Sequence, residues 1–212
     1  MRTGSLAKDI AAGSVDTLLV FGSNGRVYST PVGGLPGGRG DGQPITTLVE
    51  LESGTQPLHY FAASNDTMLL LANTGGFGLL ANVGDLASRQ KGGKSFLSLE
   101  TGEKVLPPVP LATGHSQVAC LSLGGRLLVF ALSELKHQPK GGRGLTLMDV
   151  DAKDPLVSVA TCANGLKVLG TGRGGKAKEE SLGPTALAGH VGKRARKGKV
   201  VDGIKATRVL PA

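Results

Sequence analysis

A pattern that recurs about every 50 residues constrains the fold of this chain most strongly. It is clearest in DTLLVFGSNGRVYSTPVGGL (16–35), TMLLLANTGGFGLLANVGDL (67–86) and QVACLSLGGRLLVFALSEL (117–135), and it returns more loosely in LVSVATCANGLKVLG (156–170). Each copy has an apolar run, a glycine turn and a second apolar run. Self-similarity at a period of about 20–50 residues indicates a solenoid, a propeller or another array of small units.

Each copy predicts a β-hairpin. The apolar runs contain β-branched residues, and the turns SNG, TGG, LGG and ANG hold glycine, which adopts the positive φ of tight hairpin turns at little cost. The turn glycines Gly25, Gly75 and Gly125 are 50 residues apart, and Gly165 follows 40 residues later. We therefore expect four hairpins in series.

Other strand-like stretches follow the first three hairpins, namely PITTLVEL, FLSL and LTLMDV. Three or four strands per unit match a propeller blade, and only short stretches such as residues 85–91 could form one helical turn. The expected fold is all-β: one domain over residues 1–212, a propeller-like disc of about four to five blades. Its units are expected at 1–13 (the closing strand of a first blade that is largely missing), 14–52, 57–111, 116–151 and 155–212.

Composition excludes several classes of protein. The chain holds 34 glycines and 11 prolines in 212 residues, but 40% of it is hydrophobic, which is enough for a core and argues against low-complexity disorder. No apolar run approaches a membrane span and no signal-peptide pattern opens the chain, so a cytoplasmic protein is expected. Cys120 and Cys162 are too few for a disulfide framework and are interpreted as buried apolar residues.

The charge is concentrated in the second half of the chain. Residues 1–106 hold 8 basic and 9 acidic side chains, whereas residues 107–212 hold 16 and 7. A basic half favours a polyanionic partner, because Lys and Arg neutralise phosphates and release counterions. A basic, solvated surface without a partner is the alternative interpretation.

Candidate phosphate contacts lie in glycine-containing basic segments that recur at a similar place in each unit. They are Arg39; Arg89, Lys91 and Lys94; Lys140 and Arg143; and Lys193, Arg194, Arg196, Lys197 and Lys199. The repeat should place them on one edge of the disc as a curved row that positions a duplex without reading its bases. Aromatic residues make up only 3% of the chain, which argues against stacking on single strands.

Motifs for enzyme chemistry are weak. Residues 170–175 satisfy GxGxxG, but no βαβ unit surrounds them, and Gly93-Lys94-Ser95 lacks the first glycine of a P-loop. The four histidines have no metal-ligand spacing and no paired carboxylate. We expect no catalytic residue, no metal site and no cofactor in this chain.

Four segments together resemble a known family. They are FGSNGRVYSTPVGGLPGGRGDGQPI (21–45), GFGLLANVGDLASRQKGGKSFLSL (76–99), GGRLLVFALSELKHQPKGGRG (124–144) and GHVGKRARKGKV (189–200). The chain resembles, over essentially its whole length, the C-terminal domain of the A subunit of bacterial topoisomerase IV, and more distantly that of DNA gyrase. The resemblance implies a β-pinwheel, whose blades exchange strands with their neighbours and whose basic rim binds and bends duplex DNA without sequence specificity.

The resemblance also implies a role within a larger enzyme. Such a domain presents DNA to the separate strand-passage core of an ATP-dependent type II topoisomerase, which decatenates chromosomes and relaxes supercoils. The active-site tyrosine belongs to that core, and ATP and Mg²⁺ would be used there. The expected partners are duplex DNA, the rest of the A subunit and the ATPase-bearing B subunit, and this fragment alone is expected to be a monomer.

Two alternatives stay open at this point. In gyrase the domain carries a Q-R-R-G-G-K-G box for DNA wrapping, and the closest stretch here is the degenerate Arg89-Gln90-Lys91-Gly92-Gly93-Lys94-Ser95. That favours topoisomerase IV, although the place of the box lies before residue 1, so a gyrase A-type wrapping domain is one alternative. The other is a propeller-type scaffold that binds an acidic protein partner with the same rim.

Overall fold

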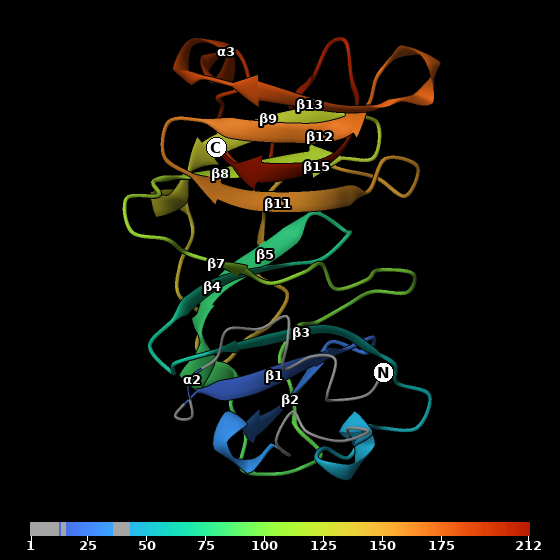
Figure 1. Cartoon of the computed structure of the whole chain (residues 1–212), viewed down its shortest axis with the longest axis vertical. Coiled ribbons are helices and arrows are strands. Elements are labelled where there is room, and N and C mark those ends of the chain that lie inside the picture. The colour runs from blue at the N-terminus through green and yellow to red at the C-terminus, as the bar shows by residue number, and fades with distance from the viewer. Residues whose placement is uncertain (1–12, 14–15, 36–42) are drawn as a thin grey trace.

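A computed structural model describes residue 13, residues 16–35 and residues 43–212, and shows an all-β fold of four antiparallel sheets that follow one another along the long axis (Figure 1). The strands are β1 (Thr17–Gly22), β2 (Arg26–Pro31), β3 (Pro57–Ala63), β4 (Met68–Ala72), β5 (Phe77–Asn82), β6 (Lys94–Ser95), β7 (Val109–Pro110), β8 (Gln117–Ser122), β9 (Arg126–Ala131), β10 (Leu145–Thr146), β11 (Leu156–Cys162), β12 (Leu166–Thr171), β13 (Ala177–Leu182), β14 (Lys199–Val200) and β15 (Lys205–Pro211). Two short helices, α2 (Val83–Leu86) and α3 (Pro184–Ala188), and four 3-10 turns complete the described part.

The sheets exchange strands along the chain. Their orders are β3-β1-β2-β6, β7-β4-β5-β10, β11-β8-β9-β14 and β15-β12-β13. In the first three sheets the last strand (β6, β10 or β14) comes from the sequence after the next hairpin has begun, so each sheet is completed by its successor. This is the strand exchange that the family resemblance implies. Each of the first three sheets therefore contains strands from two of the expected units, whose bounds stay predictions.

The turn glycines hold neighbouring units together. Gly25, Gly76 and Gly125 have positive φ, and the carbonyl oxygen of each accepts a backbone hydrogen bond from the segment that follows the exchanged strand. The donors are the N–H groups of Leu97 (2.9 Å), Leu147 (2.7 Å) and Val201 (3.0 Å). In the second hairpin the residue with positive φ is Gly76, not the expected Gly75.

The fourth predicted hairpin is wrong. Leu156–Cys162 and Leu166–Thr171 are both strands, but β11 pairs with β8 of the third sheet, whereas β12 pairs with β13 and β15 of the fourth. The real fourth hairpin is β12–β13, and Gly174 has positive φ at its turn. The hydrophobic pattern missed β13 because its sequence, AKEESL, is charged and largely exposed. The turn glycines are thus spaced regularly, and the apparent interval of 40 residues is not a true repeat.

Outside the hairpins, the short strands and helical turns differ in part from those expected. PITTLVEL is not a strand: Pro44 precedes a 3-10 turn at Ile45–Thr47. FLSL is not a strand and only follows the short exchanged strand Lys94–Ser95, whereas LTLMDV begins with the short exchanged strand Leu145–Thr146. A single helical turn forms at Val83–Leu86, close to the expected place, while α3 was not expected. The predicted closing strand lies almost wholly outside the described residues.

Three of the four core clusters among the described residues lie between successive sheets, and the fourth packs the other face of the first sheet against Ile45 and Val49. Along β4, Leu69 and Leu71 pack against the first sheet, whereas Leu70 and Ala72 pack against the third. Alternate side chains of a strand point to opposite faces, so an inner sheet covered on both sides needs an uninterrupted apolar run. This arrangement explains why the repeats are continuous apolar segments. Among the described residues, no helix is long and apolar enough to cross a membrane.

The two thiols are expected to be unreactive in the folded protein. Cys120 and Cys162 are both fully buried, in different core layers, and burial raises the pKa of each thiol. Because the thiolate is the reacting species, alkylation at mildly alkaline pH should be at least about a hundredfold slower in the folded than in the urea-unfolded chain. Mass spectrometry after iodoacetamide treatment measures this, and rapid labelling of either cysteine without urea would contradict it.

Candidate nucleic-acid interface

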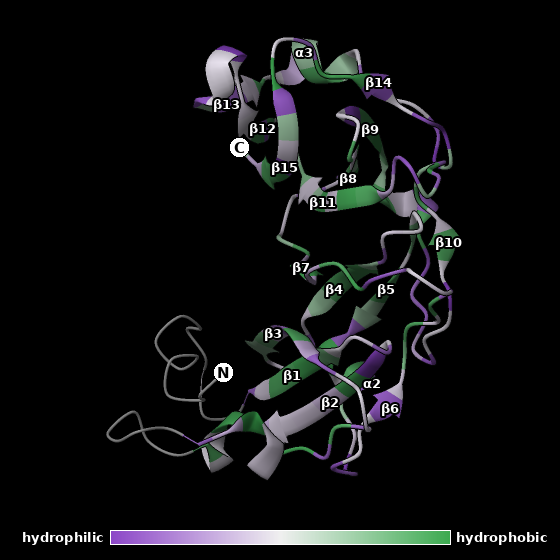
Figure 2. Ribbon diagram, turned by 90° about the vertical axis from the view of Figure 1, so that its right-hand side faces the viewer, coloured by the Kyte–Doolittle hydropathy of each residue, from purple (hydrophilic) through white to green (hydrophobic). Residues whose placement is uncertain are grey.

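The predicted cations that the structure describes lie on three segments that lead into or form the exchanged strands. We call residues 89–94 basic loop 1, residues 140–143 basic loop 2 and residues 193–199 basic loop 3. The strands they enter, β6, β10 and β14, lie along one long side of the molecule (Figure 2). Arg39 lies outside the described residues. The other ten predicted residues are therefore brought to one side by the strand exchange.

Basic loop 1 presents two exposed cations, Arg89 and Lys91. Lys94, in β6, is half-buried, and its Nζ lies 5.6 Å from the centroid of the Phe96 ring. The backbone of the loop is held in place, because the Lys91 carbonyl accepts a hydrogen bond of 2.9 Å from the N–H of Glu50. The loop thus offers charge to solvent from an anchored backbone.

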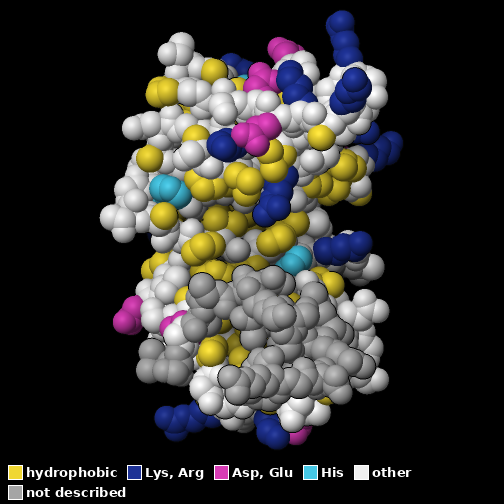
Figure 3. Space-filling model, in the orientation of Figure 1, with side chains coloured by type: hydrophobic (Ala, Val, Ile, Leu, Met, Phe, Trp, Pro, Cys, Tyr) yellow, Lys and Arg dark blue, Asp and Glu magenta, His cyan; other side chains and the backbone are white. Residues whose placement is uncertain are grey.

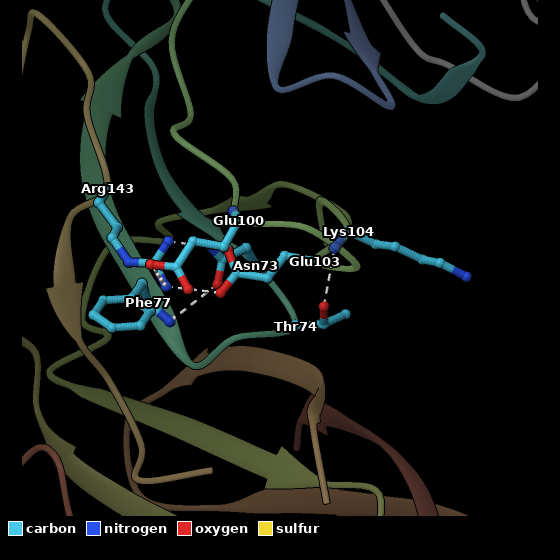
Figure 4. Close-up of polar contacts among 7 residues, drawn as sticks. All are labelled: Asn73, Thr74, Phe77, Glu100, Glu103, Lys104 and Arg143. Atoms are coloured by element: carbon cyan, nitrogen blue, oxygen red, sulfur yellow. Dashed lines mark hydrogen bonds and ion pairs between the residues drawn. The ribbon is translucent and has the colours of Figure 1, made fainter. Parts of the chain in front are cut away.

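Basic loop 2 presents one exposed cation, Lys140, and one that is already paired, Arg143. The Arg143 Nη2 lies 2.8 Å from Glu103 Oε1 and 3.3 Å from Glu100 Oε1, and its guanidinium carbon is 4.0 Å from the centroid of the Phe77 ring (Figure 4). Two carboxylates and an aromatic ring therefore already hold the Arg143 guanidinium, and its contact with a phosphate stays a prediction.

Basic loop 3 presents four exposed cations, Lys193, Arg196, Lys197 and Lys199. Arg194 is again different: it is half-buried, its Nη1 donates to the carbonyl of Thr146, and its backbone N–H donates to Glu134 Oε2 at 3.2 Å. The side chain of Arg194 therefore anchors the loop to the preceding unit. The dense run predicted from the sequence is divided between solvent-facing cations and this anchor.

Backbone hydrogen bonds join the three loops into one continuous strip. The Gly142 N–H in basic loop 2 donates to the Phe96 carbonyl just after basic loop 1, at 2.8 Å. One unit later, the Ala195 N–H in basic loop 3 donates to the Leu147 carbonyl just after basic loop 2, at 2.9 Å. Ala195 has a φ of 63° at this junction. Basic loops 2 and 3 are therefore each hydrogen-bonded to the segment that follows the preceding basic loop.

Sequence reasoning missed cations and carboxylates that support this strip. Lys136 is exposed next to basic loop 2, and its carbonyl accepts a hydrogen bond from the N–H of Leu80 in β5. Arg26 donates to the carbonyls of Gly92 (3.0 Å) and Gly93 (3.1 Å) in basic loop 1. Its partner Glu52 lies 3.1 Å away. Of these residues, Glu52 could have been found from the regular spacing of acidic residues along the chain.

Other chemistry is not assembled in the part of the chain that the structure describes. No group of three or more His, Cys, Asp or Glu side chains could hold a metal ion there. The GxGxxG match at 170–175 forms the end of β12 and the turn of the β12–β13 hairpin rather than a strand-to-helix loop. Residues 170–175 thus lack the strand-to-helix turn on which a dinucleotide phosphate would sit.

Figure 3 shows a face at right angles to the view of Figure 2, and the middle of this face is rich in apolar side chains. Hydrophobic side chains gather there over β7 and β11. They border a hollow of about 620 Å³ whose lining includes Pro107–Pro110, Val157–Thr161 and Thr207–Pro211. The cationic strip and this apolar hollow are formed by different strands, which separates the two kinds of surface.

Comparison with known proteins adds a family to this geometry. The family described as DNA gyrase C-terminal domain, beta-propeller, matches residues 16–50, 67–110 and 116–163, which is more than half of the chain. The A subunit of DNA topoisomerase 4 from Neisseria gonorrhoeae is 33% identical over 183 residues, covering 84% of this chain and 23% of the relative. Its counterpart from Escherichia coli K12 is 29% identical over 213 residues, covering 96% of this chain and 28% of the relative. The chain thus spans about a quarter of the length of these relatives.

Solved structures agree with this assignment. The structure described as the E. coli ParC C-terminal domain superposes with a TM-score of 0.82 at 26% identity, over 93% of this chain and 82% of that one. A crystal structure of the C-terminal domain of DNA topoisomerase IV, at 19% identity, has a TM-score of 0.72 over 94% of this chain and 66% of that one, and supports the fold. The matched repeats, the strand exchange and these likenesses show that the chain belongs to the DNA gyrase C-terminal domain family.

Proposed function

We propose that this chain is the C-terminal DNA-binding domain of a topoisomerase IV A subunit. It binds duplex DNA along basic loops 1, 2 and 3, through phosphates and without sequence specificity, and bends the duplex along that side. It presents the bound DNA to the ATP-dependent strand-passage core formed by the rest of the A subunit together with the B subunit, while this domain alone is a monomer without catalytic residues.

The continuous basic strip carries this proposal. Seven predicted cations are exposed on it: Arg89, Lys91, Lys140, Lys193, Arg196, Lys197 and Lys199. Bending a duplex of about 20–30 base pairs costs roughly 1–6 kcal/mol, so several phosphate contacts spread along the DNA are needed to offset it. Cations distributed over three successive units meet this requirement better than one cluster would.

The salt dependence of binding tests the proposal directly. A labelled duplex should bind with a log–log salt slope of about −3 to −6, because each phosphate contact contributes about −0.9 and seven exposed cations are available. Fluorescence anisotropy between about 50 and 200 mM salt measures the slope. A second duplex of unrelated sequence should give the same curve.

Two outcomes would reject the proposal. Undetectable binding at low salt would remove DNA as the partner. Binding that does not change with salt would show that phosphates are not what the strip contacts. Circularisation of a short linear duplex by ligase, which becomes faster when a protein bends the DNA, tests the bending step separately.

A further inference from the structure

A carboxylate recurs at every hairpin turn that precedes a basic loop. Glu52, Glu103 and Asp154 are each 51 residues apart, and we call them the turn carboxylates. Glu52 accepts a hydrogen bond from the Asn24 side chain at 2.8 Å, and Asp154 accepts one from the Gly124 N–H at 2.6 Å. Their repeated placement indicates one structural device used three times.

Glu103 shows the same contacts in the second hairpin. Its Oε2 accepts a hydrogen bond from the side chain of Asn73, which lies 49 residues after Asn24, the corresponding partner of Glu52. It also accepts a hydrogen bond from the N–H of Glu100 at 2.8 Å. The side chain of Glu103 is only 12% exposed, compared with 54% for Glu52. Glu103 is therefore more enclosed than Glu52, and its position is more strongly determined.

In each of the first two units, an arginine connects the turn carboxylate to a basic loop. Arg26 bonds Glu52 at 3.1 Å and, with the same guanidinium, the carbonyls of Gly92 and Gly93 in basic loop 1. Arg143 belongs to basic loop 2 and bonds Glu103 with both terminal nitrogens, at 2.8 and 3.2 Å (Figure 4). A planar guanidinium paired in this two-point manner defines orientation as well as distance.

The third turn carboxylate follows the pattern with a looser pair. Asp154 lies 3.8 Å from Arg126, and Arg126 stands opposite Val200, the residue that follows basic loop 3. Here Arg194 supplies a further anchor through the carbonyl of Thr146. The first two loops thus depend more on their turn carboxylates than the third does.

An acidic side chain beside a surface that binds phosphates is unfavourable unless it has another role. Like charges repel, and a carboxylate near the strip weakens the local positive potential. Glu103 and Glu100 together offset the charge of Arg143, so the cation that remains for phosphates in basic loop 2 is Lys140. Holding the loop in place explains why a carboxylate is found here.

We propose that Glu103 and Glu52 are positioning residues for DNA: Glu103 fixes basic loop 2 through Arg143, and Glu52 fixes basic loop 1 through Arg26. They determine where along the duplex the cations of each loop hold phosphates, without contacting DNA themselves. This inference rests on the proposed function, because it assumes that the loops contact a duplex.

Local cleavage of DNA from a probe on each loop tests the inference. A thiol-directed iron–EDTA reagent is attached at Lys91→Cys or at Lys140→Cys, both exposed positions, while the buried Cys120 and Cys162 stay unlabelled. Hydroxyl radicals then cut a bound duplex that is tethered by one end to the C-terminus of the chain through a short linker, so that all complexes share nearly the same register. The unsubstituted chain treated with the reagent serves as the blank.

Each turn carboxylate should affect its own loop alone. The cleavage window is the stretch of nucleotides that a probe cuts. Glu103→Gln should widen the window of the Lys140→Cys probe at least about twofold, because a loop moves more freely once its supporting ion pair is removed. The window of the Lys91→Cys probe should stay unchanged. Glu52→Gln should do the reverse. Asp66→Asn, which removes an exposed carboxylate that supports neither loop, should leave both windows unchanged.

The outcomes separate this inference from the proposed function. If anisotropy detects binding and both probes cut, but neither window changes in its matched variant, the positioning role is wrong and DNA binding stands. If either variant widens both windows equally, a general loss of structure explains the effect and the inference also fails. If neither probe cuts and anisotropy detects no binding, the proposed function fails, and the inference fails with it.

Discussion

Replacing Lys193, Arg196, Lys197 and Lys199 by glutamate is expected to weaken duplex binding at least about a hundredfold near 100 mM salt. All four side chains are exposed on basic loop 3, and the quadruple variant removes four phosphate contacts and adds four repulsive charges. The log–log salt slope should become less steep by about 2 to 4, since each phosphate contact contributes about 0.9 to its magnitude and these four are among seven exposed cations. Anisotropy titrations at several salt concentrations measure both quantities.

A variant with the same charge change elsewhere is the control. Lys104, Arg173, Lys176 and Arg208 are exposed and lie outside the basic loops, so replacing all four by glutamate alters net charge equally. This control should lose no more than about fivefold in affinity, through the weaker long-range field alone. Equal losses in the two variants would show that net charge, and not the strip, governs binding. Arg194 is left unchanged because it anchors the loop.

Gly25→Ala is expected to lower the free energy of unfolding by about 3–5 kcal/mol, the largest effect on stability that we expect from adding one methyl group. Gly25 has a φ of 77°, which costs an L-residue about 1–2 kcal/mol. A Cβ at this position would also meet the backbone carbonyl oxygen of Leu97, where the next unit docks. Urea unfolding followed by circular dichroism measures the loss.

Gly125→Ala is the matched control, because the same turn recurs in the third sheet. Gly125 has a φ of 79°, but a Cβ there would have nothing within 4 Å among the described residues. It should cost only the backbone strain, about 1–2 kcal/mol. If the two substitutions destabilise the protein equally, the close approach of Leu97 to the first turn contributes nothing to stability.

Three of the four hairpins could be predicted from the sequence because their strands lie between two core layers. Such strands contain long apolar runs, as in β4, and a glycine with positive φ separates them from their partners. The fourth hairpin could not be found in this way, because β13 forms the end of the last sheet and is charged. The segment Leu156–Thr171 imitates a hairpin in composition, although its two strands belong to different sheets.

The cations of the candidate site were easier to predict than their surroundings. Density of Lys and Arg beside glycine identified basic loops 1 to 3, but it could not distinguish the exposed Lys140 from the paired Arg143. That difference depends on Glu103, which is 40 residues away in sequence. The turn carboxylates recur at a constant interval. Their role could not be predicted, because they are single acidic residues in loops of different sequence and only the structure shows which turns they contact.

The segment that repeats in the sequence and the sheet that forms in the structure do not cover the same residues. A segment of one period supplies the hairpin of one sheet and the outer strand of the sheet before it, so neither piece is complete alone. Deleting one internal period would leave the preceding hairpin to receive its outer strand from a later copy, with that copy's own basic loop attached. Evolution can therefore lengthen or shorten such a domain while each internal junction keeps a cation-bearing loop.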